Sequence, residues 1–383
     1  MFREAGGNLK KKIQVYQQLW QEPLVTRASH IEKMLPTRWL DIFINEPLQD
    51  ISNNFWNNSN NAWPEEFLDF YTWCQHPLAS CPENYDAGSR LNISGISQKK
   101  NHELQALHIL TNQLNLGKRG LDIAGGAGHL ANLLARKKYR ITSLDYNQKL
   151  QEKGRRLYRD ANIDFQKKNI CLDDLRGCFQ KCDFVIGLHT CGSLADRQID
   201  EAIKANTKTI INIGCCYDKI HAAEAKEKSQ IFSASAMMLA SRYHPAPTKT
   251  PMASAYRFGL ELLLNHSDIA PIKKLGRPKK NWLRSDFASY VSHTMQSLNK
   301  KNPWKDTELN NFFYQKKNQI MLKRLVTANY IRILVGRPIE AYIVVCRAQR
   351  LTAAGFQVQI KEIFSPHISP RNYVILASKN KLL

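Results

Sequence analysis

The sequence predicts an α/β fold in which a mostly parallel sheet is covered by helices on both faces. Three observations predict it. From about residue 96, short apolar runs alternate with segments of helical periodicity, a pattern typical of βαβ units. A glycine-rich turn separates the first such run from the helix that follows it. Two late apolar runs, over residues 356–364 and 372–379, predict an antiparallel hairpin that closes the sheet.

The elements of this fold follow one another in order. A first helix is predicted over residues 99–114, because leucines recur at helical spacing from Leu104 to Leu114. A second helix follows the glycine-rich turn, where the leucines from Leu130 to Leu134 share one face. Strands are expected at residues 120–124, 140–145, 163–169, 183–189 and 209–214.

Two helical regions accompany this α/β domain, which is assigned residues 95–383. Residues 1–94 are predicted to form a helical N-terminal domain, since they hold short helix-like segments and several tryptophans. The asparagine-rich stretch from Asn53 to Glu66 is expected to be a loop between helices. Residues 221–330 interrupt the alternation and predict a basic helical insertion.

The charge of the chain is strongly positive and unevenly distributed. The 383 residues carry a formal net charge of +22. Residues 1–90 hold 8 Lys and Arg against 11 Asp and Glu, whereas residues 91–383 hold 47 against 22. A basic body of this size favours a polyanionic partner, RNA or DNA above all. The alternative is a basic surface that only keeps the protein in solution.

The nine cysteines and the amino terminus predict the compartment. The cysteine number is odd, and several cysteines lie in apolar runs. The amino terminus is polar, and no apolar run approaches the length that spans a bilayer. We therefore expect a cytoplasmic protein without a disulfide framework or a membrane segment. The sequence indicates no particular protein partner.

The strongest motif is a D-x-x-G-G-x-G turn that follows a predicted strand and opens a helix. Gly125, Gly126 and Gly128 have no Cβ, so a ligand can approach the backbone closely, and the helix offers free N–H groups. Asp122 precedes the glycines. Asp145 ends the next strand, where an acidic side chain commonly binds a ribose diol. Dinucleotide-binding turns follow G-x-G-x-x-G instead, and a carboxylate at Asp122 would repel their pyrophosphate.

We therefore predict that S-adenosylmethionine is the cofactor, because its amino group would pair with Asp122. The alternative is a strand–helix turn in an α/β domain that binds nothing. Asn169, after the third strand, is expected to bond the adenine edge or else to be an exposed loop residue. The predicted cofactor residues are Asp122, Ala124, Gly125, Gly126, Gly128, Asp145, Asn169 and Leu188.

Two strands are predicted to deliver reactive side chains to the same edge. The fourth ends in GLHTCG and the fifth in GCCYDK, and ligands bind beyond the carboxyl ends of parallel strands. His189 is predicted to act as a general base, because an imidazole titrates near neutrality. Cys216 and Tyr217 are further catalytic candidates. The side chains expected to converge there are His189, Cys191, Cys215 and Cys216.

Two alternatives remain open for these side chains. The cysteines and His189 can be packing groups near a ligand. One histidine and three cysteines also suit zinc, although the H-x-C and C-C spacings are not those of zinc fingers, and no metal is predicted. The region lacks the Asn/Asp-Pro-Pro-aromatic motif of methyltransferases that act on the adenine amino group, which counts against that reaction.

Five segments then occur in order: SQKKNHEL, DIAGGAGHL, GLHTCGSL, NIGCCYDKI and SPHISPRNYVILASK. Together they resemble the methyltransferase-like protein 25 family, a class I S-adenosylmethionine-dependent methyltransferase group, over about residues 95–383. The resemblance implies a Rossmann-like, seven-stranded sheet whose glycine turn holds the cofactor. The group is related to a transfer-RNA 2′-O-methyltransferase and to a glutathione-transferase-like domain protein, so the resemblance also implies an RNA acceptor.

The resemblance marks further positions in this chain. Among them, Lys100, His102, Arg371 and Asn372 are candidates for substrate contacts. The full set of marked positions is Lys99, Lys100, His102, Glu103, His189, Cys191, Gly192, Cys215, Cys216, Tyr217, Ser369, Pro370, Arg371 and Asn372.

The basic stretch from Pro271 to Arg284 adds a last substrate candidate. Its lysines and arginines can contact phosphates, and Trp282 can stack on a base; the alternative is a solvated basic loop. The sequence thus predicts an S-adenosylmethionine-dependent methyltransferase acting on RNA. The other hypotheses are methylation of a protein or a small molecule, and a non-catalytic RNA-binding scaffold with the same fold.

Overall fold

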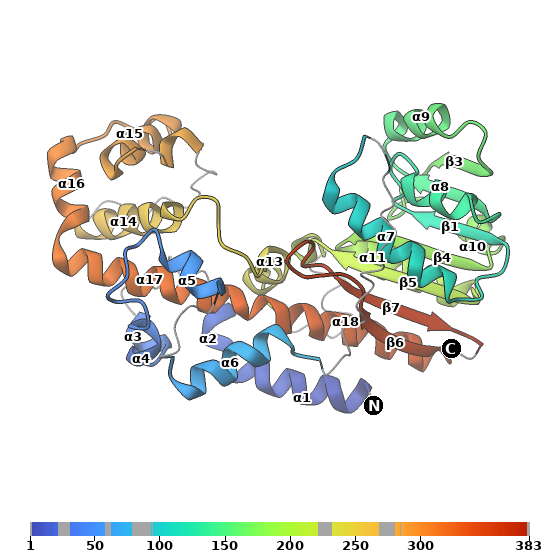
Figure 1. Cartoon of the computed structure of the whole chain (residues 1–383), viewed down its shortest axis with the longest axis horizontal. Helices are drawn as coiled ribbons and strands as arrows, with labels where there is room; N and C mark the ends of the chain where they lie inside the picture. The colour runs from blue at the N-terminus through green and yellow to red at the C-terminus, as the bar shows by residue number, and fades with distance from the viewer. Residues whose placement is uncertain are drawn as a thin grey trace. The chain divides into compact units, whose positions relative to one another are not determined.

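The computed structural model divides the chain into two compact units (Figure 1). The sheet unit comprises Met1–Val15, His76–His244 and Gly336–Leu383, and the helical unit comprises Tyr16–Gln75 and Pro245–Val335. The predicted division into residues 1–94 and 95–383 stays a prediction, since compactness does not establish which pieces fold independently. The structure describes residues 2–21, 31–57, 63–78, 93, 95–220, 232–267, 280–283 and 285–380.

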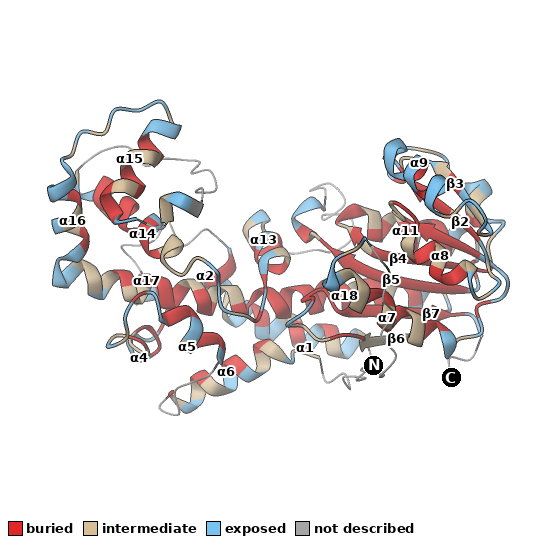
Figure 2. Cartoon of the chain, turned by 45° about the horizontal axis from the view of Figure 1, so that its top comes forward, coloured by how far each residue is buried: buried red, intermediate tan, exposed pale blue. Residues whose placement is uncertain are grey.

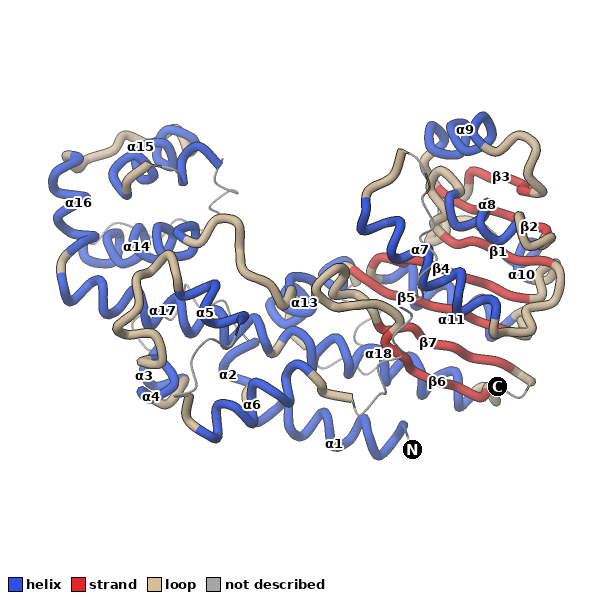
Figure 3. The backbone as a smooth tube through the Cα atoms, in the orientation of Figure 1, coloured by secondary structure: helices blue, strands red, loops and turns tan. Residues whose placement is uncertain are grey.

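The sheet unit contains a seven-stranded sheet in the order β3-β2-β1-β4-β5-β7-β6 (Figure 3). The first five strands are parallel, and β7 runs antiparallel to both β5 and β6. This is the class I methyltransferase arrangement, so the predicted fold and its closing hairpin are confirmed. The strands are β1 (Arg119–Ile123), β2 (Arg140–Asp145), β3 (Ile163–Lys167), β4 (Phe184–Cys191), β5 (Thr209–Cys215), β6 (Gln357–Glu362) and β7 (Tyr373–Ser378).

Helices cover the sheet and bury its central strands, which are red in Figure 2. The helices α8, α9, α11 and α10 belong to the strand–helix alternation, α7 precedes it, and α18 leads into the closing hairpin. The helices of this unit are α1 (Phe2–Val15), α7 (Gln98–Asn112), α8 (His129–Ala135), α9 (Gln148–Leu157), α10 (Arg176–Phe179), α11 (Ser193–Lys204), η2 (Tyr217–Lys219), α13 (Ala234–Arg242) and α18 (Gly336–Ala353).

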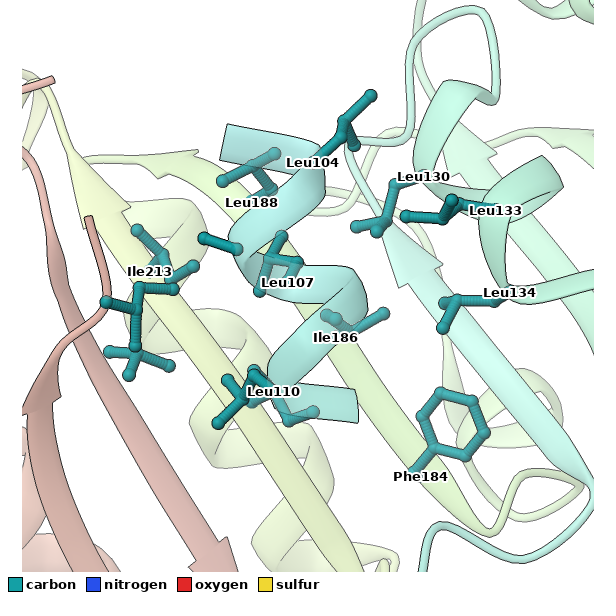
Figure 4. Close-up of a cluster of buried hydrophobic side chains, with 14 of the residues drawn as sticks. Leu104, Leu107, Leu110, Leu130, Leu133, Leu134, Phe184, Ile186, Leu188 and Ile213 are labelled. Atoms are coloured by element: carbon teal, nitrogen blue, oxygen red, sulfur yellow. The ribbon is translucent and has the colours of Figure 1, made fainter. Parts of the chain in front are cut away.

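The core beneath α7 fixes where this helix begins relative to the strand ends. Figure 4 shows Leu104, Leu107 and Leu110 of α7 close to Leu188 of β4 and Ile213 of β5. All five side chains are buried, and burial of a leucine side chain stabilises the fold by about 2 kcal/mol. The predicted leucine stripe is therefore the face that packs on the sheet, and the first turn of α7 reaches the carboxyl ends of the strands.

The helical unit is held together by aromatic packing between its two chain segments. The Phe55 ring lies 5.3 Å from that of Tyr330 and 5.7 Å from that of Tyr71, measured between centroids. No helix among the described residues is long and apolar enough to cross a membrane. The helices of this unit are α2 (Gln17–Trp20), α3 (Ile31–Met34), α4 (Thr37–Leu40), α5 (Ile51–Asn57), α6 (Glu65–Gln75), α14 (Met252–His266), η3 (Lys280–Leu283), α15 (Phe287–Ser297), α16 (Asp306–Tyr314) and α17 (Lys316–Leu334).

One local prediction is wrong in this unit. The asparagine-rich stretch was expected to be a loop, but its first residues continue α5 as far as Asn57. Phe55 and Trp56 are buried there, so tertiary burial overrides the weak helix propensity of the asparagines. Of the basic stretch at 271–284, residues 271–279 and 284 lie outside the described residues.

Candidate active site

The glycine turn after β1 has a backbone that side chains would disrupt. Gly126 and Gly128 adopt φ values of 58° and 75°, in the left-handed region that favours glycine. A Cβ at Gly125 would overlap Ser143 Oγ beneath it and lie 2.5 Å from Asp122 Oδ2. Ala124 also has a positive φ, 57°. The turn is therefore a closely packed cradle whose shape depends on its glycines.

Asp122 lies beneath this cradle as a buried acidic group. Its side chain is 1% exposed, and its Oδ2 atom makes no hydrogen bond with any described residue. Burial raises the pKa of Asp122 to about 7, while the nearby charge of Lys100 lowers it and that of Asp145 raises it. A buried carboxylate oxygen without a partner is costly, and a cationic ligand would remove that cost. Asp122 and the cradle thus fit the ammonium group of S-adenosylmethionine.

Asp145 connects the end of β2 to the same turn. Its carboxylate accepts hydrogen bonds from the N–H of Gly126 at 3.0 Å and from that of Asn147 at 2.8 Å. Gln151 donates to the carbonyl of Gly126 at 2.9 Å. These three contacts fix the turn before any ligand binds. They also place the Asp145 carboxylate where the sequence expects a partner for ribose.

His189 occupies an irregular position at the end of β4. The register with β5 shifts between Leu188 and Thr190, and His189 between them has a φ of 62°. Such bulges and left-handed non-glycine residues are costly and often lie beside active sites. The distortion turns the His189 side chain, which is 24% exposed, toward the first turns of α7.

Glu103 of α7 is the partner of that imidazole. Its Oε1 lies 2.7 Å from His189 Nε2, and the carboxylate is 1% exposed. Burial raises the pKa of Glu103, but the hydrogen bond and charge of His189, together with Ser369 and Lys100, hold it below its ordinary value. The buried Glu103 carboxylate and His189 Nε2 therefore form a short hydrogen bond that orients the imidazole ring. Because the two residues are 86 positions apart, no local sequence pattern connects them. The family resemblance marked Glu103 but gave it no role.

The other marked residues of α7 lie around this pair. Lys99 is 3.7 Å from the Glu103 carboxylate. Burial lowers the pKa of Lys100, and the charges of Glu103 and Asp122 partly offset this effect. His102 packs edge-on against Phe364 with centroids 6.2 Å apart, and its Nε2 makes no hydrogen bond among the described residues. A substrate role for Lys100 and His102 stays a prediction.

Three of the expected cysteines meet at the ends of β4 and β5. The sulfur atoms of Cys191, Cys215 and Cys216 all lie within 4.8 Å of one another. The Sγ atoms of Cys191 and Cys215 are 3.2 Å apart. His189 does not belong to this group of three thiols, and its Nε2 lies 2.7 Å from Glu103 Oε1. The structure therefore separates the predicted set into a histidine–glutamate pair and a group of three thiols.

Tyr217 and the residues of the β6–β7 loop are buried in a polar network. Tyr217 donates to Glu340 Oε1 at 3.0 Å. Arg371 donates to Glu340 Oε2 at 2.8 Å, and Asn372 accepts from Arg337 at 2.7 Å. The exposed fractions of Tyr217, Arg371 and Asn372 are 1%, 6% and 0%. Their predicted catalytic and substrate roles stay predictions, and in this structure their polar groups bind the protein.

The remaining predicted residues lie at separate places. Leu188 is buried beneath α7. The Asn169 side chain accepts from the N–H of Cys171 at 3.1 Å in the loop after β3, so an adenine contact stays a prediction. Trp282 belongs to the helical unit, where it stacks on His293 with centroids 5.6 Å apart. A nucleobase contact at Trp282 likewise stays a prediction.

The region that contains Asp122 and His189 matches a known protein family. Residues 99–223, from α7 to the segment beyond β5, match the family model described as a methyltransferase domain. This part of the chain is similar to a methyltransferase domain. S-adenosylmethionine is the cofactor of this domain, in agreement with the acidic residue and glycine cradle at the end of β1. No curated protein is significantly similar to the chain.

Solved structures similar to the chain include several methyltransferases. A TehB-like enzyme from Corynebacterium glutamicum is 12% identical over 28% of this chain and 59% of its own, with a TM-score of 0.24. The tRNA (uracil-54, C5)-methyltransferase from Pyrococcus abyssi is 18% identical over 34% and 32%, with a TM-score of 0.26. A fibrillarin/Nop5p complex contains a chain 21% identical over 38% and 76%, with a TM-score of 0.27. The matched region covers less than two thirds of the first two proteins, and similarity at this level carries no conclusion about the acceptor.

Proposed function

We propose that the protein is an S-adenosylmethionine-dependent methyltransferase that acts on RNA. One observation carries the proposal: a buried Asp122 oxygen that makes no hydrogen bond with the described residues lies beside the glycine cradle, within a region that matches a methyltransferase domain. A carboxylate in that position has a clear use only if a positive group binds there. The amino group of S-adenosylmethionine is such a group, whereas the pyrophosphate of a dinucleotide is not.

Several residues would hold the cofactor in this proposal. Asp122 pairs with the amino group, the backbone of Gly125 and Gly126 contacts the ligand, and Asp145 binds the ribose hydroxyls. When bound, S-adenosylmethionine supplies a methyl group whose bond to sulfur breaks as the bond to the acceptor forms. The chain's own residues orient the acceptor and remove its proton.

His189 is the proposed general base. Glu103 Oε1 lies 2.7 Å from Nε2; in the proposed tautomer Nε2 donates to Glu103, and Nδ1 takes the proton of an acceptor hydroxyl or amine. The pair resembles other histidine–carboxylate pairs in which the acid orients the base. Removal of such a base typically lowers the rate by about 10²–10⁴-fold.

The charge of the chain supports RNA as the acceptor. Residues 245–335, which belong to the helical unit, contain 16 Lys and Arg against 5 Asp and Glu. Lys300 and Lys301 are exposed on the loop after α15. Basic surfaces of this kind bind phosphate backbones. Methylation of a protein or a small molecule is the second hypothesis, and RNA binding without catalysis is the third.

A labelled-methyl survey tests the proposal. Purified protein is incubated with methyl-labelled S-adenosylmethionine and either total RNA or total protein from cells that lack its gene. We expect label in RNA, lost in His189→Asn and retained in His266→Asn, a matched change of an exposed histidine on α14. Label in protein or in small molecules would replace RNA as the acceptor. Salt-sensitive RNA binding without any methyl transfer would favour the scaffold hypothesis.

A further inference from the structure

We propose that Cys191, Cys215 and Cys216 form a binding site for one thiophilic d¹⁰ metal ion, Zn²⁺ or Cu⁺. This site is distinct from the cofactor cradle and from the His189–Glu103 pair. It uses the three cysteines of the thiol cluster, and the proposed methyl transfer requires none of them. Thiolates select these ions over Mg²⁺ and Ca²⁺, which prefer oxygen ligands.

The distances within the cluster suit a shared ion. Thiolate–zinc bonds of about 2.3 Å in a tetrahedral arrangement place two ligand sulfurs about 3.8 Å apart. The Sγ atoms of Cys191 and Cys215 lie 3.2 Å apart, and all three sulfurs lie within 4.8 Å of one another. Adjustments of up to about 1 Å, which rotations of the side chains provide, would bring them to coordination distance.

The fold places these sulfurs with little freedom. Cys191 and Cys215 are register partners at the ends of adjacent strands. The N–H of Gly192 donates to the Cys215 carbonyl at 2.8 Å, and Arg347 donates to the Gly192 carbonyl at 3.2 Å. Cys216 has a φ of 46°, a left-handed conformation costly for a residue with a Cβ. That conformation is what brings the third thiol into the cluster.

Positive charge around the cluster favours thiolates. Lys219 interacts electrostatically with Cys191 and Cys216. The guanidinium of Arg347 is buried beside the same strand end and interacts electrostatically with Cys215. Cys191 lies just before the first turn of α11, whose N–H groups favour negative charge. Three thiolates and one Zn²⁺ leave a net charge of −1, which these groups offset.

The number of ligands indicates the class of site. Structural zinc sites have four protein ligands, whereas sites with three leave the fourth position to water or substrate. His189 is not available as a fourth ligand through Nε2, because Nε2 is hydrogen-bonded to Glu103. Cys191 and Cys216 are only half-buried, so a fourth ligand can approach from solvent. The fourth position would therefore hold water or a donor atom of the substrate.

A disulfide is the competing use of these cysteines. Cys191 and Cys215 are close enough to be joined after a small movement, but the bond requires an oxidant and leaves Cys216 without a role. A metal ion uses all three sulfurs. The two proposals differ in what purified protein contains, because the metal form has three thiols and one ion, whereas the oxidised form has one disulfide and no ion.

Elemental analysis of the purified full-length chain tests the proposal. We expect about one equivalent of zinc or copper per chain, lost in Cys191→Ser, Cys215→Ser and Cys216→Ser. The matched control Cys178→Ser, on α10, should retain it. Replacement by Co²⁺ should give the near-ultraviolet thiolate–cobalt charge-transfer band in the wild type, weaker in Cys216→Ser. Circular dichroism verifies that each variant is folded.

Three outcomes would overturn the proposal. They are metal-free protein that does not bind added Zn²⁺ or Cu⁺ under reducing conditions, a metal content unchanged in the folded cysteine variants, and a Cys191–Cys215 disulfide in protein purified without reductant. None of these measurements requires a methyl acceptor. The metal site can therefore fail while methyl transfer stands, and methyl transfer can fail while the metal site stands.

Discussion

At the scale of single residues, the Asp122 oxygen that makes no hydrogen bond among the described residues connects stability with binding. A buried charge without a partner destabilises the ligand-free protein, and the same charge strengthens binding of a cation. Strain at functional sites is commonly tolerated for this reason. Asp122 therefore predicts opposite effects of one substitution on stability and on cofactor affinity.

Asp122→Asn should stabilise the ligand-free protein in a pH-dependent way. The pKa of Asp122 is about 7 in the folded state and near 3.9 in an unfolded chain. Between these values the folded state binds more protons, so wild-type stability falls as pH rises. The Asp122→Asn variant does not lose stability in this way as pH rises. We expect its melting temperature to exceed that of the wild type by several degrees at pH 8, with the difference shrinking toward pH 5; scanning calorimetry measures it. A constant difference across this range would contradict the burial argument.

Glu103→Gln should slow methyl transfer without weakening cofactor binding. The amide no longer holds His189 in the tautomer that frees Nδ1, so we expect kcat to fall about 10- to 100-fold while the KM for S-adenosylmethionine changes little. Glu103→Asp should restore part of the rate, because it keeps the charge. A parallel rise in KM and loss of stability in both variants would indicate a merely structural residue.

The sequence could reveal some of these residues and not others. Asp122 and the glycines form a continuous motif, so their chemistry follows from neighbouring positions. The His189–Glu103 contact joins residues 86 positions apart, across a helix and a strand whose packing depends on leucines elsewhere. The bulge that gives His189 its φ of 62° has no local sequence signal, and the burial of Arg371 depends on contacts with α18.

At the scale of elements, the conformation of the turn between β1 and α8 requires glycine at particular positions. Gly128 has a φ of 75°, and a Cβ there would overlap the ring of Phe165. The positive φ and the lack of space for a Cβ would both make a larger residue at this position destabilising. Gly177 on α10 offers a contrast, because a Cβ there would meet no atom within 4 Å.

Gly128→Ala should therefore destabilise the protein by about 2 kcal/mol or more, since a left-handed conformation alone costs about 1–2 kcal/mol with a Cβ. Gly177→Ala should be neutral or stabilise by up to about 1 kcal/mol, because alanine is the better helix former. Urea unfolding of both variants measures the difference. Equal stability of the two variants would contradict the assigned turn geometry.

The network around Glu340 locks α18 to the β6–β7 loop. Glu340 is fully buried and accepts from Arg337 at 2.9 Å and from Arg371 at 2.8 Å. Glu340→Gln would leave two guanidinium groups with less neutralising charge, so we expect a loss of about 3–5 kcal/mol in urea unfolding. The same change at the exposed Glu152 of α9 should alter stability by less than about 0.5 kcal/mol. A similar change in the free energy of unfolding for Glu340→Gln and Glu152→Gln would show that the network contributes little to stability.

Element types were largely predictable, but the helix at Ile51–Asn57 was not. Strand and helix periodicities after residue 96 are strong, because each element buries one regular face. The α5 segment has few good helix formers, and it is helical because Phe55 packs against Tyr330, nearly 300 residues later. Local propensity carries no information about such a contact.

At the scale of the whole molecule, charge predicts how RNA binding should depend on salt. Each phosphate contact contributes a slope of about −0.7 for single strands in a plot of log affinity against log salt. The double variant Lys300→Glu, Lys301→Glu should weaken binding and reduce this slope. Lys11→Glu with Lys12→Glu on α1 makes the same charge change in the sheet unit, and we expect a smaller effect. Equal effects of the two pairs, measured by fluorescence anisotropy, would indicate that only net charge matters.

The grouping of the chain into units was the least predictable feature. Residues 16–75 join residues 245–335 in one compact unit, while Met1–Val15 belongs with the sheet. The pairing rests on contacts such as Arg324 with Asp41, 2.7 Å apart, and on aromatic packing. Neither composition nor periodicity identifies partners at that separation.

The account depends on a positively charged ligand beneath the glycine turn. Isothermal titration of S-adenosylmethionine into the purified chain at pH 8, where Asp122 is ionised, tests it most directly. We expect saturable binding of one molecule per chain, weakened at least about tenfold in folded Asp122→Asn, as a lost buried ion pair requires. Absence of binding to the wild type, or equal affinity in the variant, would contradict the account.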